Sequence, residues 1–102
     1  MIENIYKTKY LEIISIEYRK KLGKIFFDIR IYKKFTKLEL SGISRILFEK
    51  LSNLKYTRAF LTYYLPGMQI GAGPWATAHF NPGLRPIEIL DFMLEFNPPN
   101  FN

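Results

Sequence analysis

The strongest constraint on the fold is a strict alternation of side-chain type over residues 24–33. Large apolar residues occupy every second position, and polar residues occupy most of the positions between them: Ile25, Phe27, Ile29 and Ile31 against Lys24, Asp28, Arg30 and Tyr32. A period of two is typical of a β-strand that buries one face and leaves the other open. Only Phe26 interrupts the polar face. The segment therefore predicts a strand in a sheet that buries one side.

The residues before this strand predict a hairpin. Residues 9–19 are rich in β-branched and aromatic side chains and contain neither Gly nor Pro. Such a composition favours a strand. The segment ends at the turn-forming run Lys-Lys-Leu-Gly at 20–23, so we expect residues 9–19 and 24–33 to pair as neighbours.

The hydrophobic period changes after Thr36, which indicates a helix. Apolar side chains recur at intervals of three or four residues, at Leu40, Ile43, Leu47, Leu51 and Leu54, with Ile46 beside them. This spacing predicts an amphipathic helix. Thr36 and Glu39 fit a capping box that starts the helix at Lys37, whereas Ser41 would cap a shorter helix and leave 37–40 as a strand end. We favour the longer helix, because Leu40 is in phase with the other apolar residues and a glycine inside a helix costs only ~1 kcal/mol.

The second half of the chain indicates further short elements. Strand composition returns at 56–65, and the Pro-Gly pair that follows fits a type II turn. A short strand at 75–80 ends at the turn 81–83. Residues 84–96 predict either a final strand or a short helix, and residues 97–102 predict an irregular tail.

Together these elements predict one α+β domain over residues 1–96. We expect a two-layer sandwich with a mostly antiparallel sheet, in the order β-β-α-β-β plus the last strand or short helix, and one helix on one face. The other face would be unusually aromatic, with Phe26, Tyr32 and some of Tyr10, Tyr18, Phe60 and Tyr64. Either the last element or a partner would then have to cover it.

Composition excludes several classes of protein and site. A length of 102 residues is enough for about one core, which excludes a two-domain enzyme. The chain has no cysteine, hence no disulfide and no thiolate site, and with His79 as its one histidine we expect no metal and no cofactor. No stretch approaches the ~20 apolar residues of a membrane span, and the first ten residues lack the apolar core of a signal peptide. We therefore expect a cytoplasmic protein.

Positive charge is concentrated in the first half of the chain. Residues 1–58 carry 14 basic and 6 acidic side chains, a net charge of +8, whereas residues 59–102 carry one basic and three acidic ones, a net charge of −2. Two basic clusters stand out, at 19–24 in the predicted hairpin and at 30–37 beyond the second strand. About ten strand residues at ~3.3 Å each separate them by roughly 30 Å, so they can form two ends of a stripe but not one pocket.

The least ordinary stretch is 66–83, which contains more than half of the Gly and Pro residues, the one Trp and the one His. Its Gly71-Ala-Gly73 run is neither a dinucleotide fingerprint nor a Walker loop, because the third glycine, the Gly-Lys pair and the following helix are missing. Trp75, Thr77 and His79 share one face of the predicted strand. His79 fits a lone general base or, as we favour, a hydrogen-bonded residue that supports the Trp75 loop.

Part of this region resembles a known sequence block. Residues 58–68, Arg-Ala-Phe-Leu-Thr-Tyr-Tyr-Leu-Pro-Gly-Met, and residues 71–82, Gly-Ala-Gly-Pro-Trp-Ala-Thr-Ala-His-Phe-Asn-Pro, are similar to a block in small bacterial α+β domains of no established activity. Some of those domains are carried on lipoprotein-like or mobile-element proteins. Pro74 departs from the block, where a small residue is expected before the tryptophan. The resemblance implies no catalytic chemistry and no ligand.

These patterns favour a small non-enzymatic binding module. We expect it to engage a protein partner, or a second copy of itself as a homodimer, through the basic aromatic sheet face or the loop region 66–83. Single-stranded nucleic acid or another polyanion is the alternative partner, since rings between lysines can stack on bases while the lysines pair with phosphates. A small hydrolase or transferase centred on His79 is a third hypothesis. The predicted binding residues are Lys20, Lys21, Lys24, Phe26, Arg30, Tyr32, Lys33, Lys34, Trp75 and His79.

Overall fold

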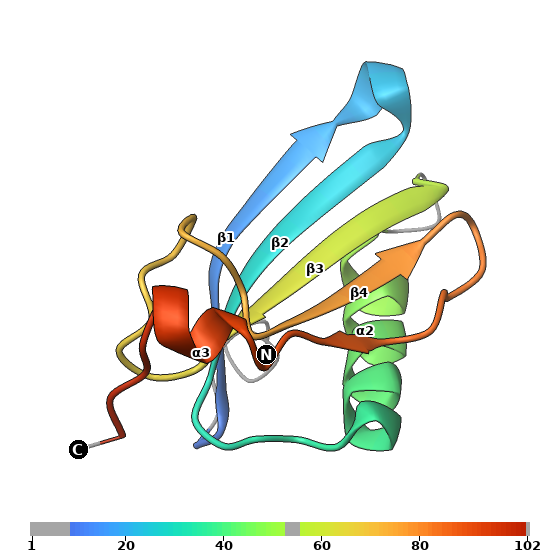
Figure 1. Ribbon diagram of the computed structural model, residues 1–102. Helices are drawn as coiled ribbons and strands as arrows, with labels where there is room; N and C mark the ends of the chain where they lie inside the picture. The colour runs from blue at the N-terminus through green and yellow to red at the C-terminus, as the bar shows by residue number, and fades with distance from the viewer. Residues whose placement is uncertain (1–8, 53–55, 102) are drawn as a thin grey trace.

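The computed structural model describes residues 9–52 and 56–101. These residues form a five-stranded sheet with one long helix on one face (Figure 1). The elements follow in the order β1 (Leu11–Arg19), the 3₁₀ turn η1 (Lys20–Leu22), β2 (Lys24–Ile31), α2 (Lys37–Ser52), β3 (Arg58–Tyr64), β4 (Ala76–Phe80), β5 (Glu88–Ile89) and α3 (Met93–Phe96). The predicted two-layer α+β sandwich is confirmed.

The sheet is mixed, with its strands in sequence order from β1 to β5. Three of its neighbouring pairs are antiparallel, as predicted, whereas β2 and β3 run parallel. A parallel pair needs a connection that returns the chain to the starting edge of the sheet. Helix α2 supplies this connection, so β3 begins beside the start of β2 at the hairpin end of the sheet.

The alternation in β2 places its apolar residues under α2. The side chains of Ile25, Phe27, Ile29 and Ile31 are each at most 1% exposed. From the helix, Leu40, Leu47 and Leu51 are buried against them, as the periodicity predicts. Leu54 lies outside the described residues.

One position of the predicted helix stripe is wrong. Ile46 is 56% exposed, whereas Ser44 is fully buried in line with Leu40 and Leu47. At 3.6 residues per turn, Ser44 falls between these two leucines on the core side, and Ile46 is rotated toward solvent. The Ser44 hydroxyl lies 2.6 Å from the Tyr63 hydroxyl, which satisfies both groups inside the core.

The longer helix and its capping box are confirmed. The backbone N–H of Thr36 donates to Glu39 Oε1 at 2.9 Å, and the N–H of Glu39 donates to Thr36 Oγ1 at 3.1 Å. These bonds satisfy two of the N–H groups that a helix start leaves without partners. The bond from the Thr36 N–H holds the pKa of Glu39 below its usual value.

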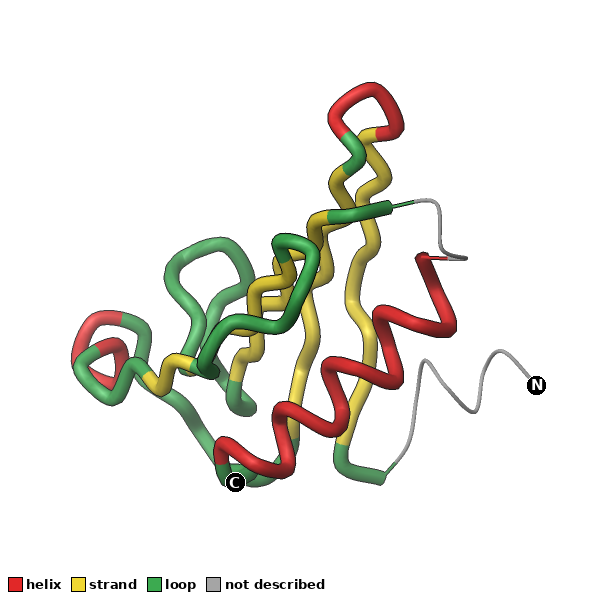
Figure 2. Tube along the Cα trace, turned by 90° about the vertical axis from the view of Figure 1, so that its right-hand side faces the viewer, coloured by secondary structure: helices red, strands yellow, loops and turns green. Residues whose placement is uncertain are grey.

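The β1–β2 hairpin extends past the rest of the molecule. Figures 1 and 2 both show its tip, formed by η1, beyond the ends of β3 and α2. Gly23 closes the turn with a left-handed backbone (φ 62°), and its N–H donates to the Lys20 carbonyl at 3.1 Å. The Gly23 carbonyl accepts hydrogen bonds from the N–H groups of Thr57 and Arg58, which ties the turn to the start of β3.

Residues 84–96 contain both elements that the sequence left open, the two-residue strand β5 and the single-turn helix α3. Figure 2 shows α2 on one side of the sheet, and α3 with its flanking loops on the other side, away from the hairpin tip. Across the described ranges, no helix is long and apolar enough to cross a membrane.

Candidate functional site

The face of the sheet opposite α2 carries three rows of side chains that cross the strands. Residues directly opposite on neighbouring strands lie on the same face. From the hairpin end inward, the register forms a cationic row, an aromatic row and a hydroxyl row. The cationic row is Arg19, Lys24 and Arg58; the aromatic row is Phe26, Phe60 and His79, with Glu17 of β1 directly opposite Phe26; the hydroxyl row is Ser15, Asp28, Thr62 and Thr77.

The aromatic row is a continuous stack across β2, β3 and β4. The ring centroids of Phe26 and Phe60 are 5.5 Å apart with planes 7° from parallel, and those of Phe60 and His79 are 4.1 Å apart at 13°. The guanidinium of Arg19 lies 5.4 Å from the Phe26 ring centroid. Phe26 is therefore in contact with Arg19 on one face and with Phe60 on the other, and Phe60 lies between Phe26 and His79.

This stack places two of the predicted binding residues, Phe26 and His79, on either side of Phe60. Phe26 lies on the open face, as its position in the alternation predicts. His79 stacks on the ring of Phe60, and its support of the Trp75 loop stays a prediction. A nucleic-acid base has no free face of Phe26 or Phe60 on which to stack, because both faces of each ring are already in contact.

The cationic row brings three like charges together. Arg19 is directly opposite Lys24, and Lys24 is directly opposite Arg58. Like charges in directly opposite positions destabilise a sheet. Glu17 pairs with Arg19, while the exposed Lys20 and Lys21 of η1 add positive charge beside the row.

Two members of this row, Arg19 and Arg58, are absent from the predicted binding residues; Arg19 belongs to the basic cluster at 19–24, whereas Arg58 belongs to neither predicted cluster. Its position depends on the parallel register between β2 and β3, which no local pattern encodes. The one signal that would have helped is the alternation of β3 itself, in which Arg58 shares a face with Phe60 and Thr62 and the apolar Ala59 and Leu61 point to the core.

In the hydroxyl row, side chains on three neighbouring strands are hydrogen-bonded to one another. Asp28 accepts from Ser15 Oγ and from Thr62 Oγ1, at 2.8 Å in each case. Both carboxylate oxygens are thus engaged, and Thr62 Oγ1 also lies 2.9 Å from the Phe27 carbonyl. This row fixes neighbouring strands to one another.

The predicted binding residues Arg30 and Tyr32 have partners within the molecule. Arg30 Nη1 lies 2.6 Å from the carbonyl oxygens of both Leu65 and Met68, so it holds the turn after β3. The Tyr32 hydroxyl donates to Glu12 at 3.2 Å, and burial, with this bond, raises the pKa of Tyr32.

The predicted lysines at the other end of β2 lie apart from the cationic row. The eight residues of β2 span about 26 Å at ~3.3 Å each, which agrees with two separate clusters. Lys33 Nζ is 4.0 Å from Glu39 and lies over the rings of Tyr10 and Phe35 at 5.5 and 5.0 Å. Lys34 is exposed.

The glycine-rich part of 66–83 is held in place by the C-terminal segment. The buried side chain of Asn97 accepts a hydrogen bond from the N–H of Gln69 and donates to the carbonyl oxygens of Gln69 and Gly73. A Cβ at Gly73 would collide with Met93 of α3. The predicted binding residue Trp75 is only 3% exposed, and its Nε1 donates to Asp91 at 3.0 Å.

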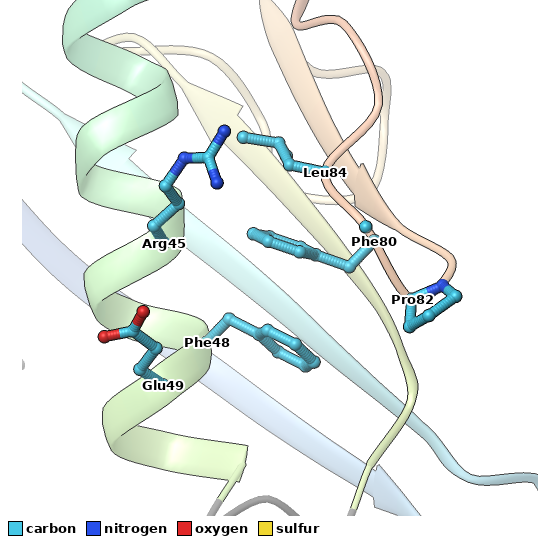
Figure 3. A pocket seen from close by; sticks show the side chains of 7 residues that line it. Arg45, Phe48, Glu49, Phe80, Pro82 and Leu84 are labelled. Carbon is cyan, nitrogen blue, oxygen red and sulfur yellow. The ribbon is translucent and has the colours of Figure 1, made fainter.

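A cavity of about 220 Å³ lies on the helix side of the sheet, between α2 and the turn after β4 (Figure 3). Its floor is formed by the stacked rings of Phe48 and Phe80, whose centroids are 4.4 Å apart. Arg45 and Glu49 lie at its edge with opposite charges. Phe80 belongs to the region 66–83 that the sequence analysis singled out, but the cavity itself was not predicted, because it depends on how the turn at 81–84 folds back toward the helix.

The described residues contain no group of three His, Cys, Asp or Glu side chains that could hold a metal ion. Comparison with known proteins finds no matching family model, no similar curated protein and no similar solved structure. The open face, with its cationic and aromatic rows, therefore has to be interpreted from its own chemistry.

Proposed function

We propose that this chain is a small non-enzymatic binding module that engages an anionic partner through the hairpin end of its open sheet face. The observation that carries the proposal is the cationic row, in which Arg19, Lys24 and Arg58 occupy directly opposite positions on three strands. Repulsion among these groups is relieved when an anion binds between them. The stacked rings of Phe26 and Phe60 border the row on the side away from the hairpin tip.

Charge favours a partner other than a second copy of the chain. A two-fold contact places the same surface patch on both subunits. Such a contact through the cationic row would bring the two sets of cations together. An acidic protein surface or a polyanion has the complementary charge, and the net charge of +6 would speed its approach.

The loop region 66–83 is less suited to this role than the sheet face. Its glycine-rich part is bonded to Arg30 from one side and to Asn97 from the other. Trp75 is buried, so it offers little surface to a partner. Between the two surfaces that the sequence suggested, the geometry therefore supports the sheet face.

Heparin provides a test with a polyanion of known charge. A Lys24→Gln, Arg58→Gln variant should bind heparin about tenfold more weakly or worse, since a hydrogen bond to a charged group contributes about 1.5–3 kcal/mol. The control is Lys34→Gln, Lys37→Gln, which removes the same charge from exposed positions at the other end of β2. Equal losses in the two variants, measured by calorimetry and by the eluting salt concentration, would show that only net charge matters and would refute a site at the cationic row.

Single-stranded nucleic acid is a second candidate, favoured by the same three cations. For single strands the slope of log affinity against log salt is about −0.7 per phosphate contacted. Three contacts give a slope of about −2, and the Lys24→Gln, Arg58→Gln variant should lower its magnitude by about 1.4. Fluorescence anisotropy of an oligothymidine over a salt series measures this. No binding at ~50 mM salt would remove the candidate.

A further inference from the structure

The tip of the β1–β2 hairpin combines exposed apolar and basic side chains. Leu22 is 50% exposed at the apex, and Tyr18 is 49% exposed just below it. Lys20 and Lys21 are exposed beside Leu22, and Arg19 and Lys24 flank the turn. No residue of η1 is buried, so the apolar side chain of Leu22 contributes nothing to the core.

The tip is a fixed projection. Its turn is closed by the hydrogen bond from the Gly23 N–H to the Lys20 carbonyl. The Gly23 carbonyl in turn accepts hydrogen bonds from the N–H groups of Thr57 and Arg58, at the start of β3. Both views of the chain show the tip as the furthest point from the rest of the fold (Figures 1 and 2). A broad, flat surface can therefore meet Leu22 and the lysines without touching the body of the molecule.

We propose that this tip docks on an anionic phospholipid bilayer, with Leu22 entering the boundary between headgroups and acyl chains. The inference rests on the proposed function and names the class of its anionic partner. Lys20, Lys21 and the two flanking basic residues would then contact lipid phosphates. Tyr18 would lie at the depth where tyrosine is enriched in membrane proteins.

The mixture of side chains favours lipid over the other polyanions. Nucleic acid and heparin satisfy the basic groups, but they leave Leu22 in water. At a bilayer interface the basic side chains can contact headgroup phosphates while Leu22 enters the apolar region just below them, as in amphipathic membrane anchors. The shape agrees, because the tip is convex and the bilayer surface is flat.

Vesicle binding tests the role of the apex. Sedimentation with phosphatidylcholine vesicles that contain about one-third phosphatidylserine should retain the protein, and vesicles of phosphatidylcholine alone should not. Leu22→Ser should weaken the partition to anionic vesicles about tenfold, because burying a leucine contributes about that factor or more. The control is Leu38→Ser, which changes a leucine that is 84% exposed on α2 and should have no effect.

Charge is tested in the same assay. Lys20→Gln, Lys21→Gln should weaken binding about 30-fold, from roughly fivefold per basic residue near an anionic surface. The equally charged variant Lys34→Gln, Lys37→Gln should lose much less. Equal losses in the two variants would show that position does not matter and would overturn the proposal.

The two proposals fail in different ways. Leu22→Ser should leave heparin and oligothymidine binding unchanged, which separates the lipid contact from general anion binding. Binding to heparin without binding to anionic vesicles, or vesicle binding that is indifferent to Leu22, would refute the lipid partner and leave the proposed function standing. Stronger binding to oligothymidine than to anionic vesicles would refute the lipid proposal and indicate nucleic acid as the partner of the tip. Failure to bind heparin, oligothymidine and anionic vesicles alike would refute both proposals.

Discussion

At the scale of single residues, Ser44 and Tyr63 place two hydroxyl groups in an apolar core. Both side chains are fully buried, and their oxygens are 2.6 Å apart. Burial raises the pKa of Tyr63 above its ordinary value, because the ionised form would lose its hydration in the core. The pair joins α2 to β3 with a directional contact that a leucine in place of Ser44 would not provide.

Removing both hydroxyls should cost less than the sum of the costs of removing each one alone. Tyr63→Phe leaves the Ser44 hydroxyl buried without its partner, and we expect a loss of about 1–3 kcal/mol in the free energy of unfolding. The double variant Tyr63→Phe, Ser44→Ala should be less destabilised than the sum of the two single variants. Urea unfolding measures all four proteins. Strictly additive losses would show that the hydroxyls do not interact.

At the scale of elements, the start of α2 shows how far local patterns reach. Thr36 and Glu39 define the helix start by their own side chains, and the structure has the bonds that the sequence indicates. Thr36→Ala should destabilise the protein by about 1 kcal/mol, as loss of an N-cap usually does.

The capping box also makes stability depend on pH. Because the folded state lowers the pKa of Glu39, the carboxylate stabilises the fold above its unfolded pKa of about 4.3 and loses this effect as pH falls through the lower folded value. Glu39→Gln should therefore be less stable than the parent at pH 7, and the difference should shrink toward pH 3. Urea midpoints at both pH values measure it. A difference that does not change with pH would show that the charge is irrelevant.

Elements whose position depends on distant pairing were harder to predict. The alternation in β2 predicted the faces of Lys24 and Phe26, because a period of two is a local property. The pairing of β2 with β3 could not be predicted in the same way. No local pattern in either strand indicates that the chain returns through α2 to run parallel to β2. For this reason Phe26 was predicted on the open face, whereas its stack with Phe60 and the place of Arg58 were not.

At the scale of the whole molecule, the C-terminal segment packs against a loop almost thirty residues earlier in the chain. Asn97 bonds to Gln69 and Gly73, and the N–H of Asn100 bonds to the Pro66 carbonyl. Gly67 has a left-handed backbone (φ 85°), and a Cβ there would collide with Asn100. The described part of the predicted tail therefore packs on the fold although it forms neither helix nor strand.

Asn97→Ala removes three hydrogen bonds at this contact. We expect a loss of about 2–4 kcal/mol in the free energy of unfolding, at about 1 kcal/mol per bond. Amide exchange of Gln69, whose N–H is bonded to Asn97, should accelerate more than that of residues in β3. A uniform acceleration would mean that the contact supports the whole fold rather than the loop alone.

The hairpin tip and the C-terminal segment lie at opposite ends of the molecule, and their charges differ as well. The tip carries Arg19, Lys20, Lys21 and Lys24, whereas the segment after β4 includes Glu88, Asp91 and Glu95. Residues 18–24 at the tip include no acidic side chain, whereas the far end of the molecule combines these acidic groups with Lys33, Lys34 and Lys37. A negatively charged surface would therefore attract the tip without repelling any carboxylate there, within the roughly 8 Å over which such fields act at physiological ionic strength.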